Sequence, residues 1–177
     1  MAAHKYSFPV QENMAAAVGR DLPISKKHAV EVCAFVRGKP VSWVKQKLEA
    51  VLDMKQAIPY RRHNTDLAHK STTKGPGRYP LTTAKHVLAL VKSAEQNAKH
   101  KGLSTVKLEI CHINAHQAAT RSHNGSRVSG VMKRSHVEVV VREALTKTKK
   151  TSEAKKATKK TAKAAPKTAA ASKESSQ

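Results

Sequence analysis

The sequence predicts an α+β fold: a three-stranded antiparallel sheet packed on three helices, with a long β-hairpin extension and a disordered basic C-terminal tail. Three observations lead to this prediction. Three stretches repeat apolar residues at helical spacing, two later stretches alternate apolar and polar residues, and the last 34 residues are rich in Lys and Ala but nearly free of large apolar side chains. A chain of 177 residues is long enough for one domain with a workable core.

The first half of the chain predicts one strand and two helices. Residues 14–21 predict a short first strand, although the alanines weaken that pattern. Ser25 is a suitable N-cap for a helix, which Gly38 ends and after which Pro40 begins the next. The apolar positions that define the two helices are Ala29, Val32, Cys33 and Val36, then Val41, Val44, Leu48, Val51 and Leu52.

Residues 59–80 contain three prolines and two glycines, which predict an irregular loop. Thr82 or Thr83 is then expected to cap a third helix that ends at Gly102. This helix has the clearest apolar stripe in the chain: Ala84, Val87, Leu88, Val91, Ala94 and Ala98.

Two stretches with a period of two follow the third helix. The first is expected to begin at Val106 and to continue through Leu108 and Ile110, and the second contains Val137, Val139 and Val141. The Ser-, Gly- and Arg-rich segment between them is too long for a tight turn. We therefore expect residues 116–134 to continue the two strands as a hairpin arm that needs a partner to rest on.

Net charge points to a polyanionic partner. The chain has 34 Lys and Arg against 12 Asp and Glu, a formal charge of +22. Residues 144–177 contribute +8 of this charge. Because Leu145 is their one large aliphatic residue, they have too little apolar surface to fold, and we expect a disordered basic tail. The domain organisation predicted is an N-terminal extension at 1–13, an RNA-binding domain at 14–143 that includes the arm, and the tail. Aromatic residues make up 3% of the chain, which favours phosphate contacts over base stacking.

The same residues argue against several other classes of protein. No apolar stretch reaches the length of a membrane span, and residues 1–10 lack the apolar run of a signal peptide. Cys33 and Cys111 form no Cys-x-x-Cys pair, which favours a reducing compartment with both thiols packed as small hydrophobes. Cys111 and His112 are neighbours in a predicted strand, so their side chains are expected on opposite faces and cannot form a nucleophile–base pair. The spacings typical of zinc ligands are missing. We expect no enzyme, no metal, no cofactor and no small-molecule substrate.

Basic residues concentrate in the loop and the arm. Tyr60 in the loop could stack on a base or ribose, or pack on the neighbouring helices. Lys26 and Lys27 lie in the first turn of a predicted helix, where the helix dipole disfavours cations, and this hints at phosphate contact. The candidate RNA-binding residues are Lys26, Lys27, Arg61, Arg62, His63, Lys74, Arg78, His116, Arg121, Arg127, Lys133 and Arg134.

Four short motifs, in order, resemble a known family. They are Ile58-Pro59-Tyr60-Arg61-Arg62-His63-Asn64; Gly77-Arg78-Tyr79-Pro80; Ser93-Ala94-Glu95-Gln96-Asn97-Ala98 with Lys101-Gly102-Leu103; and Arg134-Ser135-His136-Val137-Glu138. Over about residues 14–143 the chain resembles the universal large-ribosomal-subunit protein that lines the peptide exit tunnel, called L-twenty-two in bacteria and L-seventeen in eukaryotes. The eukaryotic or archaeal type is the more similar.

The resemblance implies a structural role in the cytoplasmic large subunit. It implies partnership with large-subunit ribosomal RNA, neighbouring ribosomal proteins and the nascent polypeptide, with an arm that reaches into the tunnel wall. The expected tip has fewer arginines than relatives commonly have, and no aromatic residue. By position, the tunnel-facing residues are Arg121, Ser122, His123, Asn124, Gly125, Ser126 and Arg127.

Two other classes of basic protein remain as alternatives. The Lys- and Ala-rich tail is similar to that of a chromatin-like DNA-compacting protein, but three helices followed by an extended arm do not suit a winged helix. A peripheral membrane protein would need an apolar face in addition to the one that each helix uses for the core. The distribution of charge favours ribosomal RNA.

Overall fold

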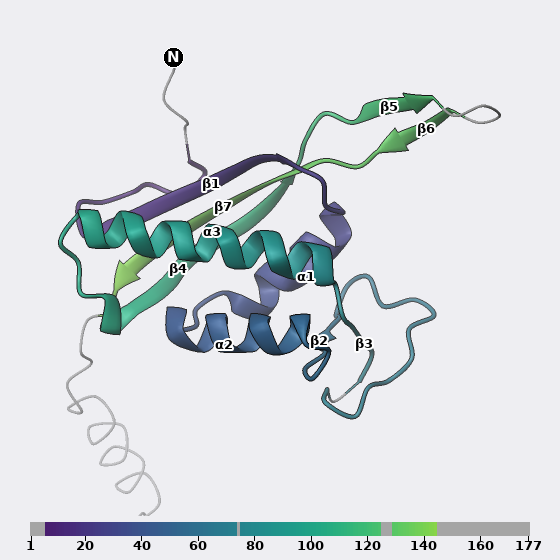
Figure 1. Ribbon diagram of the computed structural model, residues 1–177, viewed down its shortest axis with the longest axis horizontal. Helices are drawn as coiled ribbons and strands as arrows, with labels where there is room; N and C mark the ends of the chain where they lie inside the picture. Colours follow the sequence, from purple (N-terminus) through teal and green to yellow (C-terminus); the bar gives the residue numbers. More distant parts are fainter. Residues whose placement is uncertain (1–5, 74, 125–128, 145–177) are drawn as a thin grey trace, which may run out of the picture. The chain divides into compact units, whose positions relative to one another are not determined.

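The computed structural model describes residues 6–73, 75–124 and 129–144, which belong to one structural unit (Figure 1). The predicted tail beyond Ala144 lies outside the described residues. The elements, in chain order, are β1 (Met14–Leu22), α1 (Lys26–Val36), α2 (Val41–Leu52), β2 (Ile58–Pro59), β3 (Gly77–Arg78), α3 (Leu81–His100), the 3₁₀ turn η1 (Thr105–Lys107), β4 (Leu108–Gln117), β5 (Arg121–Asn124), β6 (Ser129–Met132) and β7 (Ser135–Glu143).

The main sheet is antiparallel and has the strand order β1-β7-β4. The central strand, β7, fully buries Val137, Val139 and Val141, as predicted, but Glu138 and Val140 on its other face are buried too, at 3% and 0% exposed, so burial does not alternate along it. A register shift in β4 leaves Cys111 unpaired opposite β7. The predicted α+β architecture is confirmed, with the strand nearest the N-terminus and the last strand side by side.

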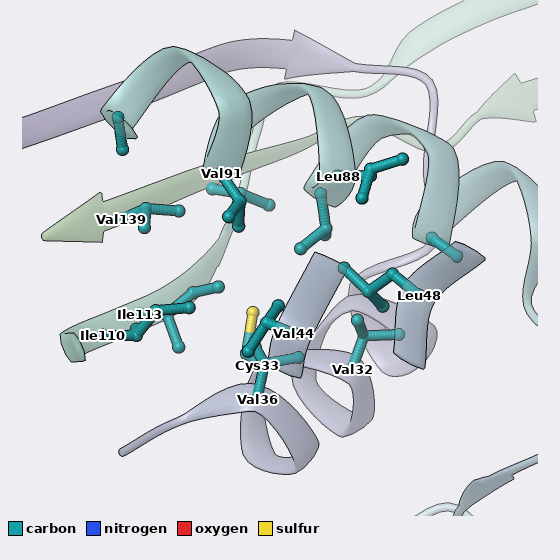
Figure 2. Close-up of a cluster of buried hydrophobic side chains, with 14 of the residues drawn as sticks. Val32, Cys33, Val36, Val44, Leu48, Leu88, Val91, Ile110, Ile113 and Val139 are labelled. Atoms are coloured by element: carbon teal, nitrogen blue, oxygen red, sulfur yellow. The ribbon is translucent and has the colours of Figure 1, made fainter. Parts of the chain in front are cut away.

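All three helices pack on one face of this sheet, and their apolar stripes form the core (Figure 2). Val32, Cys33 and Val36 from α1 lie against Val44 and Leu48 from α2. Leu88 and Val91 from α3, with Ile110, Ile113 and Val139 from the sheet, complete the cluster. Cys33 is buried as predicted, whereas Cys111 is half-buried.

Two predicted element boundaries are wrong. The strand expected from Val106 begins at Leu108, because residues 105–107 form a 3₁₀ turn that leaves the Val106 side chain 88% exposed. The third helix is capped by Pro80 rather than Thr82 or Thr83, since the helix already begins at Leu81. Ser25 holds the predicted N-cap position of α1, but its side chain makes no capping hydrogen bond.

The loop between α2 and α3 is irregular except where β2 pairs with β3 and where His69 and Pro76 form an isolated bridge. Ile58 lies opposite Arg78 and Pro59 opposite Gly77, which closes the loop at its base. An alanine Cβ at Gly77 would lie 2.9 Å from the Thr73 hydroxyl and 3.2 Å from a backbone carbonyl oxygen. Glycine thus permits the close approach of the two short strands.

Beyond the main sheet the chain continues as the predicted hairpin arm (Figure 1). Strands β5 and β6 pair with each other, Arg121 opposite Met132 and Asn124 opposite Ser129. At the base of the arm the Ala118 N–H donates to the Arg134 carbonyl over 3.1 Å. The expected tip residues Gly125, Ser126 and Arg127 lie outside the described residues.

Candidate nucleic-acid interface

The basic loop, residues 59–80, is attached to α1 through one buried carboxylate, that of Glu31, which is 2% exposed. Its Oε1 accepts hydrogen bonds from the backbone N–H groups of Arg62 (2.9 Å) and His63 (3.1 Å), and its Oε2 from that of Arg61 (3.1 Å). Burial raises the pKa of Glu31, but the three N–H donors outweigh it, so its pKa lies below the ordinary value. The backbone of residues 61–63 is fixed, while the three basic side chains of these residues remain exposed.

Tyr60, which precedes these residues, packs inside the protein and is 3% exposed. Burial raises its pKa to about 12, so the hydroxyl stays protonated, and it shares a hydrogen bond of 2.7 Å with His28 Nδ1. Burial, and then the charges of Arg78, Lys133 and His63, lower the pKa of His28. Of the two interpretations of Tyr60, packing on neighbouring elements is correct and stacking on a base is wrong.

A hollow of about 370 Å³ brings together residues from three separate segments. They come from the start of α1, from the basic loop, and from the base of the arm, where residues 117–120 and 133–134 link the main sheet to β5 and β6. The lining residues are Ser25, Lys26, Lys27, His63, Gln117, Thr120, Lys133 and Arg134. Five of these are predicted RNA-binding residues, and no acidic side chain is among them.

The hollow contains hydrogen-bond donors that lack acceptors. Arg134 Nε is buried and, within the described part of the chain, has no hydrogen-bond partner. At the start of α1 there is neither a side-chain cap nor an acidic residue in the first turn, although Lys26 and Lys27 lie there. A helix N-terminus that has no cap favours an anion with several oxygens, such as a phosphate, and the neighbouring basic side chains favour the same ligand.

The arm carries predicted residues on an exposed surface. Arg121, Ser122, His123 and Asn124 are all exposed along β5. On the returning strand Val131 is 65% exposed, so the described part of the arm lacks an apolar core of its own. Arg127, at the predicted tip, and Lys74, in the basic loop, lie outside the described residues.

His116 lies apart from the hollow, on the sheet. Its Nε2 is 3.2 Å from Oε1 of Glu138, and His112 Nε2 lies at the same distance from that oxygen. The Ser7 N–H donates to Oε2 over 3.1 Å and its hydroxyl to Oε1, which ties the predicted N-terminal extension to β7. Burial raises the pKa of Glu138, but these donors together lower it below the ordinary value.

The sequence reasoning missed the residues that position the interface, chiefly Glu31 and His28. A signal for Glu31 exists, because it is the only acidic residue between Asp21 and Glu49 in the sequence. A single carboxylate in a helix whose other charged residues are basic indicates a structural partner for that carboxylate. Gln117 and Thr120 gave no such signal, since only the fold brings them beside Lys133.

Comparison with known proteins identifies the family. Residues 17–142 match the family model described as "Ribosomal protein L22p/L17e". The chain belongs to this family. Large ribosomal subunit protein uL22 of Archaeoglobus fulgidus is 43% identical over 119 residues, 65% of this chain and 77% of the relative. That of Staphylothermus marinus is 39% identical over 150 residues, 79% of this chain and 96% of the relative.

Membership of the uL22 family makes the chain a structural protein of the large subunit of the cytoplasmic ribosome. The family is not one of enzymes, in agreement with the sequence prediction. Within the described residues, no helix is long and apolar enough to cross a membrane. No group of three or more His, Cys, Asp or Glu side chains suited to a metal ion occurs in that same part of the chain.

Proposed function

We propose that this uL22-family chain binds large-subunit ribosomal RNA through the 370 Å³ hollow and the exposed loop beside it, and that its arm contributes to the wall of the nascent-peptide exit tunnel. In this role it supports subunit assembly and translation. The observation that carries the RNA proposal is the convergence of Lys26, Lys27, His63, Lys133 and Arg134, with the buried Arg134 Nε lacking a partner among the described residues. Arg61, Arg62, Arg78 and the arm residues belong to the same proposal.

The mechanism is positional. Cationic side chains displace counterions from the RNA backbone, and this supplies affinity that weakens as salt rises. Contacts to phosphates fix the orientation of the protein without reading sequence. Because the hollow is built from α1, the loop and the arm, RNA bound there would hold the arm at a fixed angle to the domain. The exposed β5 residues and the predicted tip then face the nascent polypeptide.

The test compares two double variants with equal loss of charge. Lys26→Ala with Lys133→Ala removes two cations from the hollow, whereas Lys55→Ala with Lys92→Ala removes two lysines that already have carboxylate partners at 3.1 and 3.5 Å. Affinity for large-subunit ribosomal RNA is measured over a range of salt. We expect the hollow variant to reduce the slope of log K against log salt by about 1–2, and the control to leave it nearly unchanged.

Equal slopes for the two variants would refute the hollow as the RNA site. A duplex DNA competitor distinguishes the proposed function from the chromatin-like alternative. On the proposed function, duplex DNA should displace ribosomal RNA poorly. In cells, co-migration with the large subunit in a sucrose gradient should survive a high-salt wash. Loss of the chain from the subunit in that wash, together with tight binding to duplex DNA, would favour the DNA-compacting alternative.

A further inference from the structure

The junction between α1 and α2 gathers two of the chain's few aromatic rings. The sequence contains one Trp and two Phe, and Trp43 and Phe35 lie together with ring centroids 5.4 Å apart and planes inclined by 43°. Both side chains are half-buried, so part of each ring is open to solvent. Neither belongs to the 370 Å³ hollow or to the arm.

A second hollow, of about 310 Å³, lies beside this pair. Its apolar lining comes from Ala34, Phe35, Trp43 and Pro59. A volume of this size is about ten times the ~30 Å³ that one water molecule occupies in the liquid, enough for a planar ring. The apolar lining and the open indole therefore suit an aromatic group better than a hydrated ion.

The charged residues of this second hollow are cationic, apart from one carboxylate that is already satisfied. Arg37, Lys39 and Arg61 line it, and Glu31 is its single acidic residue. Both Glu31 oxygens accept backbone N–H groups, so this carboxylate holds the loop, and the three cations outnumber its single negative charge. The cations are complementary to an anionic ligand.

Two lysine ammonium groups lie over the indole of Trp43, at 5.6 Å for Lys39 and 5.9 Å for Lys47 from the ring centroid. Cation–π contacts at an exposed site are weak enough for a flexible lysine to leave the ring when a better partner arrives. A ligand with a flat ring and flanking negative charges would take the place over the indole and leave both ammonium groups beside its anionic oxygens. A nucleotide has this combination, whereas an acidic peptide supplies charge without the ring.

We propose that the Phe35–Trp43 hollow is a stacking site for one unpaired base of RNA, whose neighbouring phosphates are bound by Lys39, Lys47 and Arg61. This site extends the proposed RNA interface and rests on that proposed function. Arg61 lines the second hollow and His63 the first, so a single short loop segment joins them. Although aromatic residues are scarce overall, the fold concentrates two of them where cations can hold a phosphate.

Because Trp43 is the only tryptophan, its fluorescence reports this hollow directly. The full chain is titrated with a fluorescein-labelled, unstructured single-stranded RNA decamer, and anisotropy of the label measures binding independently of Trp43 emission. Inorganic polyphosphate and poly-glutamate serve as polyanions without bases. We expect RNA to quench Trp43 emission on binding, and expect the two base-free polyanions to cause much less quenching.

Variants of Trp43 test whether stacking contributes to affinity. Trp43→Leu should weaken binding of the RNA decamer about 10-fold and leave polyphosphate affinity unchanged. Trp43→Phe keeps an aromatic face and should retain most of the affinity, which separates lost stacking from a folding defect. A decrease of equal size in both variants, or in polyphosphate binding, would overturn the stacking site.

Three other outcomes of the titration test the stacking site and the proposed function separately. RNA binding seen by anisotropy with unchanged Trp43 emission would overturn the stacking site and leave the proposed function standing. Poly-glutamate that quenches as strongly as RNA would overturn it in favour of an acidic protein partner. An absence of any RNA binding by anisotropy would refute the proposed function itself.

Discussion

Replacement of Glu31 by Gln tests how the basic loop is held. The substitution keeps the size of the side chain but exchanges one carboxylate oxygen for an NH₂ group, which donates rather than accepts. In the folded protein the carboxylate accepts three backbone N–H groups, those of Arg61, Arg62 and His63, and is 2% exposed. At best, the single amide oxygen keeps the two donors that now share Oε1.

The size of the effect follows from these contacts. One buried N–H loses its acceptor and faces another donor, at a cost of about 1–3 kcal/mol. The two retained hydrogen bonds change from charged to neutral acceptors, which removes about 1 kcal/mol more. We therefore expect Glu31→Gln to lower the free energy of unfolding by about 2–4 kcal/mol, a large part of the total of about 5–15 kcal/mol for a typical domain.

The assay is urea unfolding followed by Trp43 fluorescence at neutral pH and at about pH 3. The pKa of Glu31 is lower in the folded than in the unfolded chain, so its stabilisation is present above the unfolded pKa of ~4.3 and is lost as pH falls through the folded pKa. The difference between wild type and variant should therefore shrink on acidification.

Glu49→Gln is the matched control, because Glu49 is 54% exposed and pairs with Lys92 at 3.5 Å. Its loss should cost less than about 1 kcal/mol. If Glu31→Gln were no more destabilising than this control, or if its effect were the same at both pH values, the assignment of Glu31 as the anchor of the loop would be refuted.

Four further predictions concern Gly77, Glu138, the two strands of the arm and residues 144–177. Gly77→Ala should destabilise the protein by about 1–3 kcal/mol in thermal unfolding, because the new Cβ meets a hydroxyl and a backbone carbonyl, whereas Gly19→Ala meets mobile leucine methyl groups and should cost less; equal melting temperatures would contradict this. Glu138→Gln should lower stability at neutral pH more than at pH 3, since its pKa is depressed in the folded chain, and a pH-independent difference would argue against this contribution. Amides of β5 and β6 should exchange rapidly in the free protein and slowly in the ribosome, and strong protection in the free protein would refute the need for a partner. Deletion of residues 144–177, which carry +8, should weaken RNA binding mainly at low salt, and an unchanged salt slope would refute a phosphate role for the tail.

The fold was largely predictable from the sequence because its helices and strands carry strong periodic patterns. Val137, Val139 and Val141 are fully buried along β7, as predicted, although Glu138 and Val140 between them are buried as well. The exceptions are places where local geometry breaks the period. Val106 continues the alternation of apolar and polar residues in the sequence, but a 3₁₀ turn places its side chain in solvent. Likewise, the register shift beside Cys111 has no signature in the residues around it.

The candidate interface was predictable in its charges and not in its supports. Basic residues without acidic neighbours in the sequence, such as Arg61 and Lys133, are recognisable as candidates for an anionic partner, because their charge is not balanced within the chain. The convergence of His63 and Lys133 in one hollow depends on tertiary contacts between segments about 70 residues apart. The pairing of Phe35 with Trp43 likewise depends on the angle between two helices, which composition does not reveal.

The central claim is that the hollow formed by α1, the basic loop and the base of the arm binds ribosomal RNA. Lysine footprinting tests it most directly, by comparing acetylation of each lysine in the free chain and in purified large subunits that carry it. We predict that Lys26, Lys27 and Lys133 become strongly protected in the subunit, while Lys55 remains reactive. Unchanged reactivity of the three hollow lysines, with protection confined to the residues 144–177, would contradict the account.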